Sequence, residues 1–445
     1  MEFNTIVDLI FLTLGIIVLI PCLMFFVECL AAFLSASPSF DPENVHPQGS
    51  AIAPQPRTTV LIPAHNEAEQ IVNVIQVLQT QLTEQDQVIV IADNCHDDTA
   101  ELARSTKVNV LEREHKTDRG KGYALDYAIK YMFKNNINPE VLVILDGDCI
   151  VKPDTIKNIT SKAIATGRPV QATYLMEQPD NPSLKDRVSM FSIKVKNQVR
   201  LLGLNRLGWH SLLTGSGMAF PWSLINQVSL AGSKTTDDMQ LTVDLVLANS
   251  TPVFCENALV MGRLMKDQDA QSQRSRWEHG HLEMIGVEVP RLLKAFIKTN
   301  PKGRHEVSAL ALAPNVLKDT APRHEVSPLG HIASNWAALG LALDILIPPL
   351  SLLVMTWMAS MIVVWSVAIY TTVVIFPAIV VTIAGGFLLG GVLLAWIKFG
   401  RADLPLKNLI AIPFYILGKI PIYLNFLVKP QSRWLKTERD LPNNH

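Results

Sequence analysis

Residues 141–148 read VLVILDGD, which is a run of five apolar residues followed by the acidic pair Asp146 and Asp148. A short, continuous apolar run of this kind is typical of a strand that is buried on both faces of a parallel sheet. Ligands of such sheets bind at the carboxyl ends of the strands. Two carboxylates one residue apart at that position can bind a hard cation and leave coordination positions for phosphate oxygens. An Asp-x-Asp pair also arises by chance in exposed turns, so the preceding strand is what makes this pair informative.

Upstream of this stretch, short apolar runs alternate with helical patterns. The predicted strands are 58–62, 87–92, 108–111 and 141–145, and the predicted helices follow residue 67 and cover 120–134. This alternation predicts an α/β domain whose parallel sheet is covered on both faces. Asn66 is suited to be the N-cap of the first of these helices. Asp93 follows the second strand, so it is expected at the same edge of the sheet as Asp146 and Asp148.

Two features at this edge could bind a nucleotide diphosphate. Asp93 can accept a hydrogen bond from a base or a ribose, although Asp also favours turns and helix caps. The helix that is predicted to begin near residue 120 would offer amide groups and the positive end of its dipole to phosphates. Lys121 would add a positive charge there. Residues 120–122 read GKG, but the glycine spacing before them is not that of a Walker motif.

Two later clusters could complete a transferase site. Asp237 and Asp238 precede an apolar helical pattern, and pairing can raise the pKa of one carboxyl and make it a base. Alternatively, both charges simply complement the helix dipole. Gln273, Arg276 and Trp277 lie within one helical turn, where Arg276 could bind a diphosphate and Trp277 could stack on a sugar. An amphipathic helix that rests on an anionic membrane would use the same residues.

Two further features are more ambiguous. Trp209 and His210 precede the sequence TGSGM at 214–218 and could line an acceptor pocket, whereas a single histidine is more often structural. The sequence RHEVS occurs at 304–308 and again at 323–327. We interpret this repeat as a local duplication and assign no chemistry to it, although two His-Glu pairs could also bind a metal.

The composition points to a membrane protein in a reducing compartment. Of the 445 residues, 49% are hydrophobic and only 18% are charged, which is apolar for a soluble protein. The formal net charge of −1 gives no general argument for binding nucleic acid. The five cysteines are scattered without a Cys-x-x-Cys pair, a spacing that predicts neither a zinc site nor a disulfide framework.

Two apolar zones are long enough to cross a membrane. The first, over 9–34, is interrupted only by Glu28, and a span needs roughly 20 apolar residues. A cleaved signal peptide is the alternative, but Glu2 and Asp8 stand where a basic region would be. The second zone, 345–397, contains no charge and suits two helices, at about 338–364 and 369–397, or three shorter ones.

The basic residues after this zone predict the topology. They are expected to stay in the cytoplasm. An even number of crossings between the middle domain and this basic tail places the domain on the same side of the membrane. The stretch 404–428 is apolar but interrupted by prolines and lysines, so we expect a helix in the membrane interface, with a further span as the alternative. The expected organisation is an N-terminal membrane helix at 1–35, a linker at 36–56, a catalytic domain at 57–300, a polar connector at 301–335, membrane helices at 336–398, and an interfacial helix with a basic tail at 399–445.

Taken in order, the clusters resemble the membrane-embedded branch of glycosyltransferase family 2. This branch includes cellulose, hyaluronan and poly-N-acetylglucosamine synthases and the ceramide glucosyltransferases. The matching segments, within roughly 57–300, are 63–67 (PAHNE), 92–94 (ADN), 120–122 (GKG), 146–148 (DGD), 236–238 (TDD) and 273–277 (QRSRW). Each segment is modest alone, but six of them in order are specific. Asp237 departs from the family, which usually has Glu there.

The resemblance implies a GT-A fold and a single displacement that inverts the anomeric carbon. It implies that Asp238 is the general base and that Asp146 and Asp148 bind Mg²⁺ or Mn²⁺. The substrate-binding residues that it implies are Glu67, Asp93, Lys121, Asp146, Asp237, Gln273, Arg276 and Trp277.

The expected function is transfer of a sugar from a nucleotide sugar, in the first place a UDP-sugar, to a growing glycan for the cell surface. The expected partners are the donor, a glycan or lipid acceptor, membrane lipids and candidate export or polymer-synthesis proteins, without nucleic acid. The expected location is a bacterial inner membrane, with the catalytic domain in the cytoplasm. Single-sugar transfer to a membrane lipid is the nearest alternative, since three spans are few for a polymer channel. A nucleotidyltransferase, which would release pyrophosphate, and a non-enzymatic membrane scaffold are the more distant alternatives.

Overall fold

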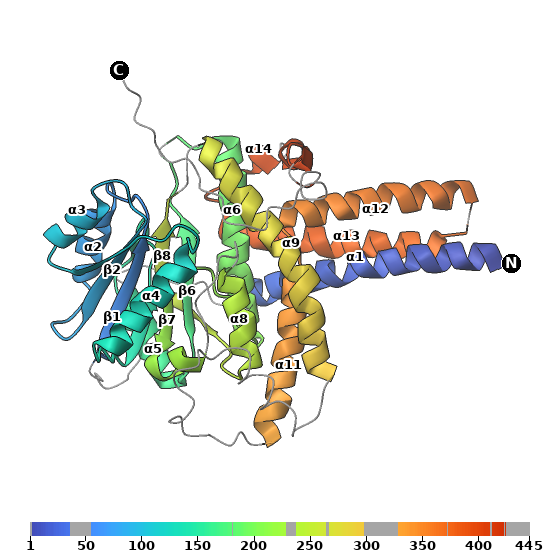
Figure 1. Ribbon diagram of the computed structural model, residues 1–445. Coiled ribbons are helices and arrows are strands. Elements are labelled where there is room, and N and C mark those ends of the chain that lie inside the picture. Colours follow the sequence, from blue (N-terminus) through green and yellow to red (C-terminus); the bar gives the residue numbers. More distant parts are fainter. Residues whose placement is uncertain are drawn as a thin grey trace.

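The computed structural model describes residues 2–35, 55–179, 181–227, 237–263, 267–297, 328–371, 373–409, 412–421 and 423. An α/β domain lies at one end of the molecule, and a group of long helices extends away from it (Figure 1). The predicted linker at 36–56, the connector at 301–335 with its RHEVS repeat, and the basic tail lie largely outside the described residues.

The sheet of the α/β domain is parallel in one half and mixed in the other. Its described strands follow the order β3-β2-β1-β4-β7-β6-β8-β5. They are β1 (Thr58–Ala64), β2 (Gln87–Asp93), β3 (Asn109–Arg113), β4 (Val141–Ile144), β5 (Ile150–Val151), β6 (Val170–Met176), β7 (Met218–Pro221) and β8 (Val253–Gly262). Strands β3, β2, β1 and β4 are parallel, as the sequence predicts, but β7 runs antiparallel to β4. The mixed half arises because the chain between β6 and β7 leaves and re-enters the sheet at the same end.

Helices cover both faces of the sheet, as expected for a fully buried strand pattern. Val60 and Ile62 of β1 pack with α2 and α5, whereas Leu61 between them packs with α4 and α8 on the other face. The helices around the sheet are α2 (Ile71–Gln79), α3 (Thr99–Ser105), α4 (Lys121–Lys134), α5 (Thr155–Thr166) and α8 (Asp237–Leu247), with a 3₁₀ turn η3 (Trp222–Gln227).

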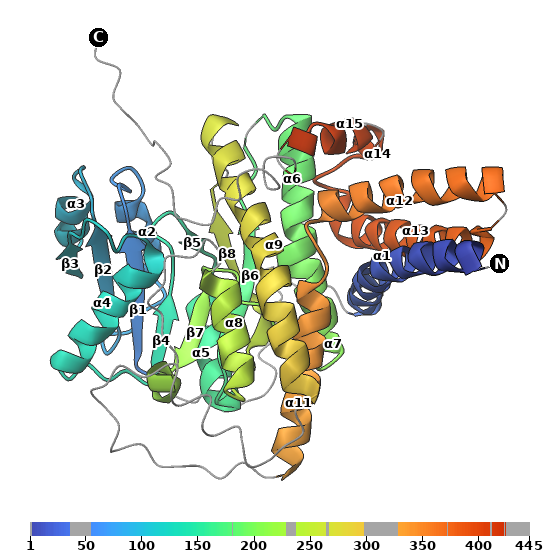
Figure 2. The same ribbon diagram turned by 45° about the vertical axis from the view of Figure 1, so that its right-hand side comes forward.

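A layer of helices lies between the sheet and the group of long helices (Figures 1 and 2). The helix at 184–206 is continuous and consists of α6 (Leu184–Lys194), the π-helical turn η2 (Val195–Arg200) and α7 (Leu201–Arg206). Helices α9 (Asp267–Ile297) and α11 (Pro328–Ile345) pack against each other and against α8. In the described part of the chain, these elements connect the sheet to the long helices.

Among the described residues, three helices are long and apolar enough to cross a membrane, over 4–34, 350–371 and 375–400. They are α1 (Glu2–Leu34), α12 (Leu350–Thr371) and α13 (Ile375–Ala395), the last of which continues into the π-helical turn η4 (Trp396–Gly400). The three helices pack against one another. Buried residues of α1, including Cys22 and Phe25, belong to the same apolar core as the helix at 184–206.

The helix boundaries in the second apolar zone differ from the prediction of 338–364 and 369–397. Residues 338–345 belong to α11, and the chain leaves the helix before Pro348 and Pro349. A proline removes a backbone donor and disfavours helix in the residue before it, so this pair separates α11 from α12. Within 336–398 the described residues thus contain two candidate spans rather than three.

The region after α13 also differs from the single helix expected over 404–428. Its described part contains two short helices, α14 (Leu406–Leu409) and α15 (Ile412–Leu417), at the end of α12 and α13 that is nearer the α/β domain (Figure 2). Pro405 immediately precedes α14, and Pro413 lies in the first turn of α15, a position where a proline is tolerated in a helix.

Candidate active site

The carboxyl ends of β1, β2 and β4 meet at one edge of the sheet, as the sequence predicts. His65 Nδ1, just after β1, lies 2.7 Å from the carbonyl oxygen of Asp93 at the end of β2. The turn after β4 packs against the end of β1, since a Cβ added at Gly147 would lie 3.2 Å from Ala64 Cβ and 3.4 Å from Glu67 Cγ. Glu67 is therefore a neighbour of the 146–148 turn.

Asn66 is not the N-cap that we predicted. Helix α2 begins four residues later than expected, at Ile71, and Asn66 has a left-handed backbone conformation with φ of +56°. Its side-chain oxygen instead accepts a hydrogen bond from the amide of His96 at 2.8 Å. Asn tolerates this conformation and forms such local bonds readily, so the residue builds the loop at the sheet edge rather than a helix start.

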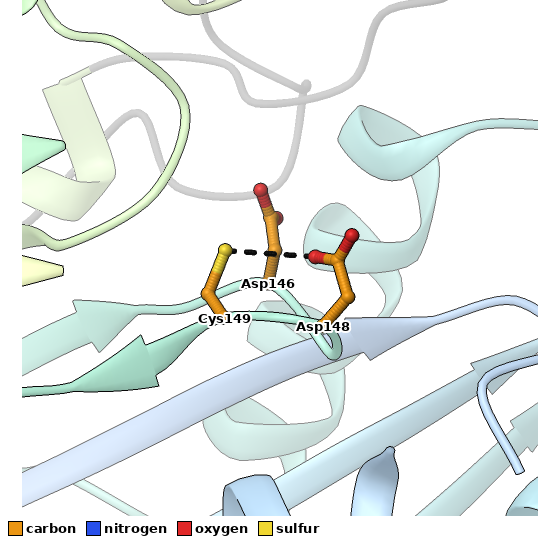
Figure 3. A group of neighbouring side chains, drawn as sticks. All are labelled: Asp146, Asp148 and Cys149. Atoms are coloured by element: carbon orange, nitrogen blue, oxygen red, sulfur yellow. Dashed lines mark hydrogen bonds between the residues drawn. The ribbon is translucent and has the colours of Figure 1, made fainter. Parts of the chain in front are cut away.

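Asp146, Asp148 and Cys149 form the one group of three candidate metal ligands among the described residues, with ligand atoms within 4.8 Å of one another. Their side chains project to the same side of the turn after β4 (Figure 3). The two carboxylates fit Mg²⁺ or Mn²⁺, which prefer oxygen ligands. Burial, with Asp148 and Asp146 nearby, raises the pKa of Cys149 well above its usual range. The thiol therefore stays protonated and donates to Asp148 Oδ1 at 3.5 Å.

Lys121 joins this acidic turn to the segment that precedes β7. Its Nζ pairs with Asp146 Oδ1 and donates to the carbonyl oxygen of Gly215 at 2.6 Å. The backbone amide of Asp146 donates to Ser216 Oγ at 3.1 Å, which adds a second link to the same segment. Lys121 is the first residue of α4, so the amide groups of the first turn of α4 lie beside its charge.

Gly215 brings Asp238 to the same place. A Cβ added at Gly215 would lie 3.7 Å from Asp238 Oδ2 and 3.9 Å from Lys121 Nζ. The φ of Gly215 is +94°, a conformation that favours glycine. The structure thus assembles Asp146, Lys121 and Asp238 around one loop, although 92 residues separate the two carboxylates.

The charges in this group shift one another's titration. Burial raises the pKa of Asp238, and the ammonium groups of Lys196 and Lys121 oppose that rise. Burial likewise raises the pKa of Asp146, and Lys121 opposes it. Burial alone would lower the pKa of Lys121, but the adjacent Asp146 raises it overall. A carboxyl with a raised pKa is a better proton acceptor than an ordinary Asp, so Asp238 suits the role of a general base.

Asp93 has a cationic partner that the sequence reasoning missed. Arg113 Nη1, at the end of β3, lies 2.6 Å from Asp93 Oδ1, and both side chains are largely buried. Asn94 Nδ2 donates to the same oxygen at 3.1 Å. The signal was present in the sequence, because Arg113 follows the third predicted strand just as Asp93 follows the second. Lys196, the cation near Asp238, carried no such signal, since it lies in a helix without a recognisable motif.

The cluster over 273–277 is positioned by the helix that carries it. It lies in α9, which packs against α8, the helix that begins with Asp237 and Asp238. Arg276 is buried and Trp277 is half-buried, and the side chain of Gln273 lies outside the described part of the structure.

His210 is not an open acceptor-pocket residue. It is almost fully buried, and its Nε2 lies 2.9 Å from Asp344 Oδ2 of α11. The structural interpretation of this histidine is therefore correct. Trp209 is partly exposed and packs against Gly340 of the same helix.

A GT-A sheet with acidic residues at its carboxyl edge and flanking apolar helices defines a glycosyltransferase. The chain matches the family described as "Glycosyltransferase like family 2" over residues 54–280, just over half of its length, and it belongs to this family.

Two solved structures are similar to it. The mannosyltransferase PcManGT from Pyrobaculum calidifontis, in complex with GDP-Man and Mn²⁺, is 15% identical, with 87% of this chain and 99% of that chain covered and a TM-score of 0.45. Glucosyl-3-phosphoglycerate synthase from Mycobacterium tuberculosis, in complex with Mn²⁺, UDP and phosphoglyceric acid, is 17% identical, with 51% and 78% covered and a TM-score of 0.35. No curated protein matches the chain.

Proposed function

We propose that the protein is a membrane-bound, inverting glycosyltransferase that transfers a sugar from a UDP-sugar to a growing glycan. The observation that carries this proposal is the grouping of Asp146, Lys121 and Asp238 around Gly215. In this proposal the group would supply a metal-binding carboxylate, a phosphate-binding cation and a base to one site, as transfer from a nucleotide diphosphate requires.

Asp238 removes the proton from the acceptor hydroxyl as its oxygen attacks the anomeric carbon. The bond from that carbon to the diphosphate oxygen breaks on the opposite side, which inverts the configuration. Lys121 and the first-turn amides of α4 stabilise the charge that develops on the leaving diphosphate. Asp146 and Asp148 would hold Mg²⁺ or Mn²⁺, which supplies further positive charge to the leaving group. Arg276 and Trp277, with Gln273, would close over the diphosphate and the acceptor.

The nucleotide would lie toward the β1–β2 side of the same edge. Both described contacts of the Asp93 carboxylate use Oδ1, so a hydroxyl or base nitrogen of the nucleotide would bind through Oδ2. Arg113 would hold this carboxylate in its orientation, since its Nη1 lies 2.6 Å from Asp93 Oδ1. Glu67, beside the 146–148 turn, and Asp237, beside the base, would complete the substrate contacts.

The growing glycan and a membrane lipid are both acceptors that this arrangement could use. The site lies in the domain that carries α8, and α8 packs on helices joined to the membrane bundle. Single-sugar transfer to a membrane lipid is the second candidate function, because the three candidate spans of the described residues offer little material for a polymer channel. The proposed location is a bacterial inner membrane with the α/β domain in the cytoplasm.

The deciding experiment is nucleoside diphosphate release by the purified protein in nanodiscs. A panel of nucleotide sugars would be tested with Mn²⁺, with Mg²⁺ and with EDTA, in the presence of membrane-lipid extract. We expect metal-dependent release from one donor, which Asp238→Asn and Asp148→Asn both abolish. A ladder of radiolabelled products would indicate glycan extension, and a single lipid-linked product would indicate single transfer. Release of pyrophosphate, or release that survives Asp238→Asn, would refute the proposal.

A further inference from the structure

A buried network of charged side chains joins the membrane helix α1 to the catalytic domain. Glu28 of α1 is fully buried, and its Oε2 lies 2.7 Å from Arg200 Nε. Arg200 Nη2 also donates to the carbonyl oxygen of Asp344 at 3.0 Å and pairs with Asp344 Oδ1. His210 Nε2 lies 2.9 Å from Asp344 Oδ2. One guanidinium group thus connects residues that are 172 and 144 positions away in the sequence.

Burying this network costs free energy, so we ask what the charged side chains contribute in return. Removing charges from water is expensive, and apolar side chains of similar size would fill the same volume at no such cost. What charged partners add is one defined relative position of the elements that carry them. A close contact between the two helices fixes the same position near Arg200. A Cβ added at Gly203 would lie 2.0 Å from the carbonyl oxygen of Glu28, so only glycine leaves room for this contact. Helix α7 therefore contacts the backbone of α1 at the residue that Arg200 binds.

The network residues outside α1 are Arg200, His210 and Asp344, and each lies on an element that packs close to Asp238. Arg200 lies in the helix at 184–206, and Val195 and Val199 of that helix belong to the same buried cluster as Met239, the residue after Asp238. His210 precedes by five residues Gly215, which lies beside Asp238 Oδ2. Asp344 is in α11, which packs against α8, the helix that begins with Asp237 and Asp238.

We propose that Glu28, Arg200, Asp344 and His210 are positioning residues that fix the catalytic domain on the membrane helix α1 and, through the elements packed against the start of α8, hold Asp238 in its working position. This proposal rests on the proposed role of Asp238 as the base. Its consequence is that a residue of the membrane helix contributes to the chemical step without touching a substrate.

The test compares Glu28→Gln and Asp344→Asn with Lys194→Met. Lys194 lies on the same 184–206 helix and pairs with Asp403 in the segment after α13, so its loss also weakens the link to the membrane segments but not the link to Asp238. We expect Glu28→Gln and Asp344→Asn to lower kcat about tenfold or more while the donor KM stays within about twofold, as for a misplaced catalytic group. Lys194→Met should leave kcat within about twofold of wild type.

A double-mutant cycle separates positioning from general damage. If Glu28 and Asp344 act through the same network, the fall in kcat for Glu28→Gln should be largely absent in an Asp344→Asn background, because coupled residues are not additive. Additive losses in kcat, or an equal loss in Lys194→Met, would overturn the proposal. UDP affinity and the melting temperature would show that each variant is folded. If Glu28→Gln does not fold, Arg200→Lys keeps the charge and loses the forked geometry, and it should still lower kcat.

Failure of this proposal is distinguishable from failure of the proposed function. Asp238→Asn without activity and Glu28→Gln with full activity would refute the network and retain the base. Activity in Asp238→Asn would refute the base, and with it the reason for the network.

Discussion

At the scale of single residues, the partly buried position of Asp238 makes a prediction about pH. Since burial raises its pKa, the acid limb of kcat/KM against pH should lie above about 3.9, the ordinary value for Asp. Activity should fall as the pH falls through this limb, because the base must be deprotonated. The neighbouring variant Asp237→Asn should keep the limb at the same pH. A profile that is flat down to pH 4 would contradict the assignment of Asp238 as the base.

The same shift predicts a trade-off between activity and stability. A carboxyl whose pKa is raised on folding favours the folded state when it is protonated, and this contribution is lost as the pH rises through the folded pKa. At pH 7 the ionised Asp238 therefore lowers the free energy of unfolding. Asp238→Asn should raise the melting temperature at pH 7, and the difference should shrink as the pH approaches 4. An equal or lower melting temperature at pH 7 would contradict the direction of the shift.

The Asp93–Arg113 pair predicts a loss of both stability and nucleotide affinity. Only about a tenth of each side chain is exposed, so Arg113→Met leaves a buried carboxylate without its cation and should cost about 3–5 kcal/mol. The matched control is Arg104→Ala, which removes an exposed pair with Glu112 in the adjacent part of the fold and should cost about 1 kcal/mol or less. Denaturation and UDP titration measure the two effects. If Arg113→Met and Arg104→Ala lost similar free energies of unfolding, the prediction that the buried pair contributes more than the exposed pair would be refuted.

The sequence identifies the carboxylates but not their partners. Asp93, Asp146 and Asp148 could be located because each follows an apolar strand, which is a local pattern. Arg200 could not be linked to Glu28, because nothing in the chain indicates which distant residues meet after folding. The same limit applies to Lys196 near Asp238.

At the scale of elements, the close approach of α7 and α1 predicts sensitivity to one methyl group. Gly203→Ala places a Cβ 2.0 Å from the carbonyl oxygen of Glu28, so the helices must separate, and overpacking of this kind costs about 1–3 kcal/mol. The control is Gly286→Ala in the exposed face of α9, where a Cβ meets nothing within 4 Å. That change should stabilise the helix by about 0.5–1 kcal/mol. Thermal unfolding in nanodiscs would compare the two, and a neutral Gly203→Ala would refute the tight contact.

Elements were predictable where the local pattern was unambiguous. The four parallel strands and α4 agree with the sequence, because alternating apolar runs and turn residues define them. The helix boundaries in the second apolar zone were wrong, since uniform hydrophobicity hides a break that only Pro348 and Pro349 mark. The mixed half of the sheet was also missed, because strand direction depends on where the chain re-enters the sheet.

At the scale of the whole molecule, the membrane helices and the catalytic domain share one core. Residues of α1, the helix at 184–206, α9, α11 and α13 all contribute to the same buried cluster. The domain is therefore not a separate globule on a tether, and the position of the helices constrains the site. Lys398 reinforces this arrangement, since its Nζ donates to the carbonyl oxygens of Ala32 and Phe33 at the end of α1.

The shared core also predicts which parts of the molecule face opposite sides of the membrane. Tyr370 is highly exposed and belongs to the last turn of α12. Helices α12 and α13 extend away from the α/β domain, and the end of α12 that precedes α13 is the end far from that domain (Figure 1). Glu101 is an exposed residue of α3 in that domain. Basic residues follow α13 on the domain side, and such residues remain in the cytoplasm. The proposed topology therefore places position 370 outside and position 101 inside.

Labelling of single cysteines tests this topology. In a Cys95→Ser background, whose other native cysteines are buried, a membrane-impermeant maleimide should label Tyr370→Cys in intact spheroplasts. It should label Glu101→Cys only after the membrane is permeabilised. The reverse pattern would place the catalytic domain outside, where cytoplasmic nucleotide sugars cannot reach it. Labelling of both positions from the same side would mean that α12 and α13 do not cross the membrane. The basic residues that follow α13 would then lie on an ordinary protein surface rather than at the boundary of the membrane.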